Sequence, residues 1–341
     1  MINSLTYLTR RCPRHCSYCA LRDAKDIGKE LNVVSWIEAF YILKELGVDF
    51  NLILGNETWL LGHRILSILG RNKVPYALYT TCPEPTFSKY RDWFFSECLD
   101  NLSCGMDYPV LPGFTIQDDS FYKSVSAYKG FKWVKENYPF VDTHATITVH
   151  RKNLQYLLAL AKQLIELKVF YAINFIHWNK DGKFDFFPKD NVISDLLFQP
   201  SDYPLIQSTL NEVISFSGSI LQSPEVVEMV AKDPELLQMR WHCGGNPYGG
   251  PTIDADGRLR VCGYRKGIHT PQFTIFDLPH HIDDWREAVR KDAKDCPGCV
   301  WLYPMQFHYW NNTDASMGRN VFVKHGGTHI DKNKWSKRII E

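Results

Sequence analysis

Cys12-Pro-Arg-His-Cys16-Ser-Tyr-Cys19 is the stretch that decides how this chain is interpreted, and it directly follows an apolar, strand-like run at residues 5–9. Three thiolates in one compact loop can converge on one soft metal centre. Three ligands leave one iron of a four-iron cube open to a substrate or cofactor, whereas a structural zinc site needs a fourth protein ligand. The loop therefore favours an iron–sulfur centre, with zinc as the alternative.

A second group of four cysteines lies far along the chain, at Cys243, Cys262, Cys296 and Cys299. Asp256-Gly257 lies between two alternating runs and predicts a β-hairpin that ends at the second of these cysteines. A helix is expected over residues 283–292, just before the C-x2-C pair. Four thiolates complete the coordination of either an iron–sulfur cluster or a zinc ion, so both stay open here.

The composition excludes several classes of protein. The 341 residues carry 39 Lys+Arg against 38 Asp+Glu, so we expect no nucleic-acid binding through phosphate neutralisation. No apolar run approaches the ~20 residues of a membrane span, and the N-terminus has no signal-peptide pattern. We therefore expect a cytoplasmic protein without a membrane partner, whose ten cysteines stay reduced and need a role other than disulfides.

Strand-like and helical segments alternate along the first half of the chain. Strands are expected at residues 5–9, 49–54, 75–79, 100–104, 143–149 and 169–176. Helices are expected between them, including residues 63–69 and 88–97, with the first helix opened by a Ser35–Glu38 capping box and the last capped by Asn153. This pattern predicts an α/β fold, a partial (β/α)6 TIM-like barrel whose reactive site lies at the C-terminal strand ends. The first cysteine loop follows the first strand and so lies at that end.

The first cysteine loop resembles that of the radical S-adenosylmethionine (SAM) superfamily, in which C-x3-C-x2-C holds a [4Fe–4S] cluster. The resemblance implies that Cys12, Cys16 and Cys19 hold the cluster, that its open iron binds SAM, and that Tyr18 lies beside the adenine. It also implies reductive cleavage of SAM to a 5′-deoxyadenosyl radical, which abstracts a hydrogen atom from an unactivated C–H bond. An electron donor such as flavodoxin or ferredoxin is implied as a partner.

Other strand ends are similar to the SAM-binding positions of that superfamily. Residues 55–58, Gly-Asn-Glu-Thr, take the place of its Gly-Gly-Glu-Pro motif with two of four positions changed. The similarity implies a group of cofactor-binding residues: Gly55, Asn56, Glu57, Thr80, Thr81, Ser103, Asp107 and Asn153. Ordinary turn chemistry accounts for Gly, Asn, Thr and Ser at strand ends about as well.

The hairpin, helix and C-x2-C pair resemble the twitch domain, the shortened form of the SPASM domain. The resemblance implies a small α+β domain in which the four later cysteines ligate a second, auxiliary [4Fe–4S] cluster that relays electrons. We expect a radical SAM partial barrel over residues 1–185 and a helical connector over 186–240. A twitch/SPASM-like domain over 241–310 and a C-terminal tail over 311–341 complete the expected organisation.

The substrate is expected to be a small molecule such as a sugar, an aminocyclitol or a nucleotide-like compound, which would undergo dehydrogenation, epimerisation or rearrangement. The first strand begins near Leu5 and leaves no room for an N-terminal leader-binding domain, so a peptide, as for a RiPP maturase, comes second. A zinc-binding structural or interaction protein on an α/β scaffold is the alternative of another class.

Five further residues at strand ends are candidates for chemistry on the substrate. Cys82 and Cys104 are candidate hydrogen-atom donors, although a free cysteine is at least as often a small buried hydrophobe. His150, Arg151 and His177 are candidates for binding or deprotonating the substrate, although a hydrogen-bonded structural histidine is the commoner outcome.

Overall fold

The computed structural model describes residues 3–12, 14–19, 29–48, 50–55, 65, 66, 69, 74, 76–80, 99–139, 141–184, 187–216, 218–243, 250–263, 265, 267–302 and 304–306. Within this part of the chain, no helix has the length and apolar character needed to cross a membrane.

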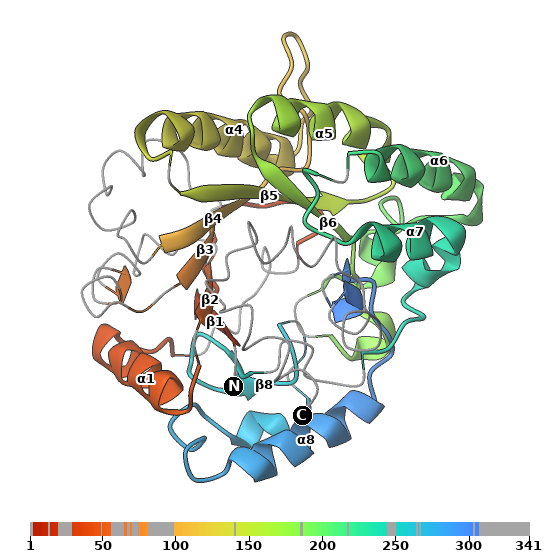
Figure 1. The fold of residues 1–341 in the computed structure, drawn as a ribbon. Coiled ribbons are helices and arrows are strands. Elements are labelled where there is room, and N and C mark those ends of the chain that lie inside the picture. Colours follow the sequence, from red (N-terminus) through yellow and green to blue (C-terminus); the bar gives the residue numbers. More distant parts are fainter. Residues whose placement is uncertain are drawn as a thin grey trace.

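One curved sheet organises the described residues, with the strand order β6-β5-β4-β3-β2-β1-β7-β8. Its first six strands are β1 (Asn3–Thr9), β2 (Phe50–Gly55), β3 (Tyr76–Thr80), β4 (Leu99–Gly105), β5 (Asp142–Val149) and β6 (Phe170–Phe175). Each of these strands pairs with the next in parallel. The predicted parallel sheet is therefore confirmed, and it bends into the arc of a partial barrel (Figure 1).

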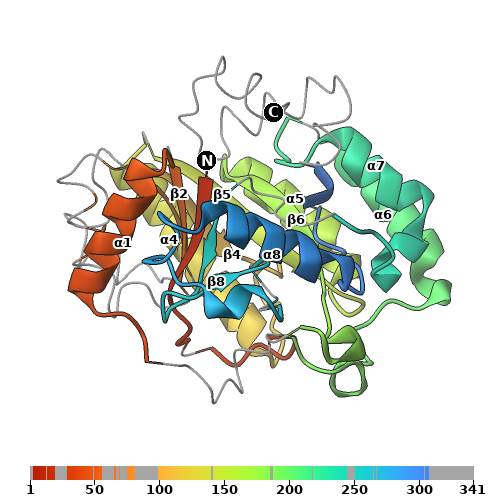
Figure 2. The same ribbon diagram turned by 90° about the horizontal axis from the view of Figure 1, so that it is seen from below.

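The helices lie on the outer side of this arc (Figures 1 and 2). They are α1 (Val33–Glu45), α4 (Asp119–Asn137), α5 (Leu157–Glu166), α6 (Tyr203–Ile214), α7 (Pro224–Lys232) and α8 (Ile282–Lys294). The helix expected at 88–97 lies outside the described residues, as does most of the one expected at 63–69. Parallel strands with helical crossovers bury one sheet face against the helices, which explains the nearly continuous apolar core.

Two predicted helix caps are wrong. The first helix begins at Val33, and its cap is Asn32, whose side-chain oxygen accepts the backbone N–H of Ser35. Ser35 is thus the third residue of the helix, because an asparagine upstream already supplies the capping oxygen. Asn153 makes no side-chain cap either, since its amide bonds the ends of β4 and β5 instead, and a short 3-10 turn (Leu154–Tyr156) precedes α5.

Side chains alternate between the two faces of the central strands. On β4, Leu102 and Cys104 belong to the apolar core that packs against the helices. Ser103 lies between them on the opposite face, and its hydroxyl is 2.9 Å from the hydroxyl of Thr146 on β5. His144 shares that face of β5 with Thr146. On β4 and β5 the inner face of the arc therefore carries hydroxyl and imidazole side chains.

The predicted hairpin is confirmed and extends the same sheet. Strands β7 (Thr252–Ile253) and β8 (Leu259–Arg260) pair antiparallel, and Gly257 supplies the left-handed turn with φ 83°. Strand β7 also pairs in parallel with β1. The segment that carries the second cysteine group is thus hydrogen-bonded to the strand that leads into the first.

A buried cluster of charges reinforces this junction. Arg10, directly after β1, places its guanidinium over the ring of Tyr7 and donates from Nε to Asp254 Oδ1 at 2.6 Å. Arg260 on β8 pairs with the other oxygen of the same carboxylate. All four side chains are largely excluded from water. Burial opposes ionisation of Asp254, but the two guanidinium groups outweigh it and hold its pKa at about 2.

Candidate active site at the C-terminal end of the parallel strands

The first cysteine loop is held against the beginning of α4. The Arg14 guanidinium donates to the Ser126 hydroxyl at 2.9 Å, and the backbone N–H of His15 donates to Asp119 at 2.6 Å. Asp119 lies in the first turn of the helix, where an acidic group also favours the helix dipole, and Ser126 lies about two turns further along. Residues 14–19 therefore stand in a fixed place at the carboxyl ends of the strands.

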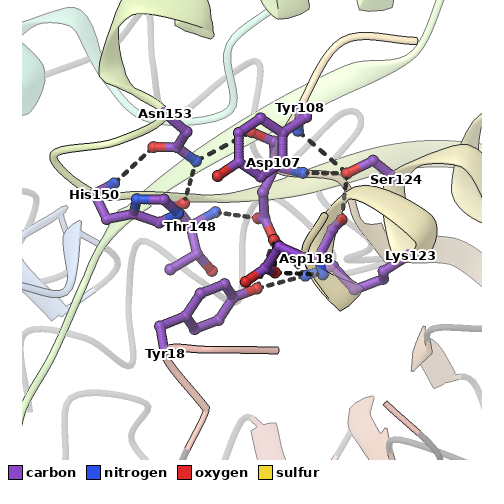
Figure 3. A network of polar contacts seen from close by, with 10 residues as sticks. Tyr18, Asp107, Tyr108, Asp118, Lys123, Ser124, Thr148, His150 and Asn153 are labelled. Carbon is purple, nitrogen blue, oxygen red and sulfur yellow. Dashed lines mark hydrogen bonds and ion pairs between the residues drawn. The ribbon is translucent and has the colours of Figure 1, made fainter. Parts of the chain in front are cut away.

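Tyr18 of this loop, which is partly buried, forms a closed triangle with the buried side chains of Asp107 and Lys123 (Figure 3). The Tyr18 hydroxyl donates to Asp107 Oδ2 at 2.5 Å. Lys123 Nζ lies 2.6 Å from the Tyr18 hydroxyl oxygen and 2.6 Å from Asp107 Oδ2. The second carboxylate oxygen of Asp107 accepts the backbone N–H of Thr148 at 2.8 Å. The side chains of Lys123 and Asp107 are 7% and 0% exposed, so this is a charge pair almost fully removed from water.

Lys123 of the triangle and the nearby thiol of Cys16 affect each other's pKa. Burial alone would lower the pKa of Lys123, but the negative charges of Asp107, Cys16 and Cys19 raise it above its ordinary value. Burial in turn raises the pKa of Cys16 to about 12, against the opposing pull of the Lys123 ammonium. A thiol in this place keeps its proton until a metal centre replaces it, and the neighbouring cation favours the resulting thiolate.

The ends of β4 and β5 are joined by side-chain amide and hydroxyl groups (Figure 3). Asn153 donates to the carbonyl oxygens of Asp107 and Thr148 and accepts the N–H of His150 at 2.7 Å. The Ser124 hydroxyl on α4 accepts the N–H of Asp107 at 2.8 Å. Asp107 is consequently fixed at its backbone and at both carboxylate oxygens.

His150 lies among aromatic rings at the end of β5. Its ring centroid is 5.9 Å from that of Tyr18 and 6.1 Å from that of Tyr108. Burial lowers its pKa to about 4, although Asp107 and Asp118 act in the opposite direction. The imidazole is therefore neutral at physiological pH, a state in which one nitrogen donates and the other accepts a hydrogen bond.

The second cysteine group is drawn together by backbone contacts. The N–H of Cys299 donates to the carbonyl oxygen of Trp241 at 2.7 Å, which brings the segment leading to Cys243 beside the C-x2-C turn. Within that turn, Gly298 has φ 119°, and a Cβ there would lie 1.6 Å from the carbonyl oxygen of Met239. No residue other than glycine fits this turn as it is packed.

The thiols of this second group interact with one another. Burial raises the pKa of Cys299 well above its usual range, a hydrogen bond from the N–H of Trp301 lowers it, and the charges of Cys243, Cys262 and Cys296 raise it further. Among the described residues, no three His, Cys, Asp or Glu side chains converge closely enough to hold a metal ion. An iron–sulfur cluster is several atoms wide and its ligands need not converge on one point, so the donor chemistry of four soft thiols suits such a cluster.

The remaining predicted site residues are placed as follows. Gly55 and Thr80 end β2 and β3, whereas Asn56, Glu57, Thr81 and Cys82 lie outside the described residues. Cys104 lies in the apolar core, where burial raises its pKa to about 12. Arg151 is half exposed and pairs with Asp202 at 3.1 Å, away from the triangle. His177 contacts the second cysteine group, with Nε2 3.6 Å from the Sγ of Cys299.

Sequence reasoning missed Lys123, which contributes the cation of the site. A signal was present: Ser120, Lys123, Ser124 and Ala127 follow helical spacing and form the buried face of α4. A lysine between small residues on a buried face needs a buried partner. Gly105 makes room for its side chain, since a Cβ there would lie 2.9 Å from Lys123 Nζ.

Solved structures share this architecture. SuiB of Streptococcus suis bound to S-adenosylmethionine matches with a TM-score of 0.54 and 13% identity over 77% of this chain. This chain spans 60% of the length of that SuiB chain. The anSMEcpe structure with bound AdoMet and Kp18Cys peptide matches with a TM-score of 0.57 and 14% identity, over 96% of this chain and 97% of anSMEcpe.

A second SuiB structure, bound to the precursor peptide SuiA, matches with a TM-score of 0.57 and 14% identity, over 89% of this chain and 70% of that one. No family model matches the sequence, and no curated protein is similar enough to be matched to it. The SuiB and anSMEcpe structures were both solved with S-adenosylmethionine bound. The chain therefore shares the fold of these two S-adenosylmethionine-binding proteins.

Proposed function

We propose that this protein is a radical SAM enzyme with two iron–sulfur clusters. The observation that carries the proposal is the first cysteine loop, held at the carboxyl ends of the parallel strands beside the triangle of Tyr18, Asp107 and Lys123. Cys12, Cys16 and Cys19 hold the first cluster, and the open iron leaves a place for the amino acid moiety of SAM. When bound and reduced, these groups supply a 5′-deoxyadenosyl radical that abstracts a hydrogen atom from the substrate.

The protein's own residues position these groups. Tyr18 is fixed through its hydroxyl, so its ring has one orientation in which it can pack beside an adenine. Gly55, Thr80, Ser103, Asp107 and Asn153 stand at or near the carboxyl ends of four successive strands and are the described residues proposed to contact SAM. Asn56, Glu57 and Thr81 continue two of these strand ends and are proposed with them.

The second cluster is proposed to be held by Cys243, Cys262, Cys296 and Cys299. Complete ligation by protein leaves no iron open, so this cluster would exchange electrons rather than bind the substrate. A flavodoxin or ferredoxin is the proposed electron donor to the first cluster. A zinc ion at the second site is the alternative, and it would remove the electron-relay role because zinc has no redox chemistry.

Two substrate classes remain for the same chemistry. The polar inner face of the arc, with Ser103, His144 and Thr146, supports a small hydroxyl-bearing molecule such as a sugar, aminocyclitol or nucleotide-like compound. The peptides bound in the SuiB and anSMEcpe structures support a peptide substrate instead. Incubation of the reduced enzyme with deuterated members of each class distinguishes them, because deuterium appears in 5′-deoxyadenosine only when the substrate is attacked.

The metal content tests the proposal as a whole. After anaerobic purification and reconstitution, iron and acid-labile sulfide are expected at about eight each per chain, as two four-iron clusters require. About four irons with one equivalent of zinc per chain would show that the second site holds zinc and that the first site still holds a four-iron cluster. Zinc without iron would make the protein a zinc-binding structural protein and overturn the proposal.

A further inference from the structure

The chain after β6 reaches across to the Cys296–Cys299 turn. His177 is buried at this strand end, and its Nδ1 lies 3.0 Å from the carbonyl oxygen of Phe175. A carbonyl only accepts, so Nδ1 carries the hydrogen and Nε2 of the neutral ring is an acceptor. Nε2 lies 3.4 Å from the N–H of Val300 and 3.6 Å from Cys299 Sγ. The imidazole thus ties a barrel strand to the cysteine turn.

A second contact lies three residues further along. Lys180 Nζ donates to the carbonyl oxygen of Pro297, inside the C-x2-C turn, at 3.3 Å. The imidazole of His177 is itself held by stacking on Phe187, with centroids 4.9 Å apart and planes 16° apart. The lysine therefore places a positive charge directly against the turn, and the histidine has one fixed orientation.

We propose that His177 and Lys180 form a clamp through which the barrel holds the auxiliary cysteine turn. His177 is a positioning residue for Cys299, and Lys180 is a fixed cation beside the cluster; this rests on the proposed function in that the four cysteines bind an iron–sulfur cluster. Hydrogen bonds and charge around the sulfurs are the protein's main means of setting a cluster's potential. The clamp therefore sets the stability of the auxiliary cluster through His177 and its potential through the charge of Lys180.

The test isolates the auxiliary cluster in the full-length chain. Changing Cys12, Cys16 and Cys19 together to alanine removes the first cluster, so about four irons per chain are expected after reconstitution. In this background, His177→Ala is expected to lose iron to a chelator at least tenfold faster. His177→Gln, whose side-chain oxygen can accept the Val300 N–H, is expected to restore most of the retention.

The charge of Lys180 is tested by a redox titration followed by electron paramagnetic resonance. Lys180→Met is expected to make the cluster about tenfold harder to reduce, a downward shift of 59 mV for one electron. Lys183→Met is the matched control, because it removes the same charge from an exposed position on the same turn, and its potential should stay at the parent value.

The outcomes separate the clamp from the cluster itself. If His177→Ala holds four irons and releases them at the parent rate, His177 does not hold the cysteine turn. If the reduction potential of Lys180→Met equals that of the parent, Lys180 does not set the potential. Both results together overturn the clamp and leave the auxiliary cluster intact. A chain that takes up no iron, or zinc in its place, while His177 and Lys180 are native would overturn the auxiliary cluster and the clamp together. Because Lys180→Met retains side-chain bulk, it tests the clamp even where His177→Ala fails to fold.

Discussion

Lys123 Nζ on α4 lies 2.6 Å from Asp107 Oδ2 at the end of β4, and both side chains are almost fully excluded from water. This pair joins a helix to the strand end beneath the first cysteine loop, and Tyr18 of the loop bonds both partners. Because neither charge has water to replace its partner, the pair is expected to matter most when one half is removed.

Lys123→Met keeps the bulk of the side chain but leaves the Asp107 carboxylate buried without its cation. We expect the free energy of unfolding to fall by about 3–5 kcal/mol, measured by urea denaturation of the metal-free protein. The matched control is Lys162→Met, which breaks a surface pair with Glu212 and should change stability by about 0–1 kcal/mol. An equal loss of unfolding free energy in the two variants would show that the buried pair contributes no more to stability than a surface pair.

Gly298→Ala is expected to disrupt the second cysteine turn. The new Cβ would overlap the carbonyl oxygen of Met239, and φ 119° is unfavourable for alanine. Gly113→Ala is the control, since Gly113 also has a positive φ of 74° but has open space around its Cβ position. We expect Gly113→Ala to lower the free energy of unfolding by about 1 kcal/mol from the left-handed backbone alone. Gly298→Ala is expected in addition to retain about four irons fewer per chain than the wild-type protein. Full iron in Gly298→Ala would show that the turn is not a ligand site.

The Arg10–Asp254–Arg260 cluster predicts a loss of stability in acid. The pKa of Asp254 is held at about 2 in the folded chain, below the ~3.9 of an unfolded aspartate. The unfolded state binds the proton first, so this contribution is complete above pH ~4 and is lost as the pH falls toward 2. It amounts to about 2–3 kcal/mol, measured by denaturation at a series of pH values. Asp254→Asn should reduce the slope in this window, and an unchanged slope would contradict the assignment.

His144 predicts a second pH effect at higher pH. It is fully buried on β5, and burial lowers its pKa to about 3. Its folded pKa is depressed, so the unfolded state takes the proton first, and stability falls as the pH decreases from ~6.5 toward 3. His150 and His177, each with a pKa lowered by burial to about 4, act in the same direction. His144→Leu should flatten this dependence by several kcal/mol, and a pH dependence unchanged from that of the parent chain would disprove the burial effect.

The parallel sheet and the hairpin could be predicted from the sequence because local signals determine them. Apolar runs at regular spacing predict the strands, and Asp256-Gly257 predicts a turn that few other dipeptides can make. The C-x3-C-x2-C spacing likewise predicts the first site without any tertiary information, and this site stays a prediction. Among the described elements, two helix caps were predicted wrongly, because Asn32 supplies the capping oxygen before Ser35 can do so and because the Asn153 amide bonds strand ends instead.

The contacts that complete the site could not be predicted, because they join residues far apart in sequence. Lys123 meets Tyr18 across 105 positions, and His177 meets Cys299 across 122. The pairing of β7 with β1 involves only two residues on each strand, and so short a strand shows no recognisable alternation in the sequence. Such contacts follow from how the sheet brings strand ends together, so they become visible only in three dimensions.

The most direct test of the proposed chemistry is the cleavage of SAM by the reconstituted enzyme. With SAM and a one-electron reductant under anaerobic conditions, the wild-type chain is expected to form 5′-deoxyadenosine. Cys16→Ala is expected to form none and to retain about four irons, while the Cys296→Ala/Cys299→Ala double variant still cleaves SAM. Formation of 5′-deoxyadenosine by Cys16→Ala at the wild-type rate would contradict the account, because the loop held beside Tyr18, Asp107 and Lys123 would then not be the site of the reaction.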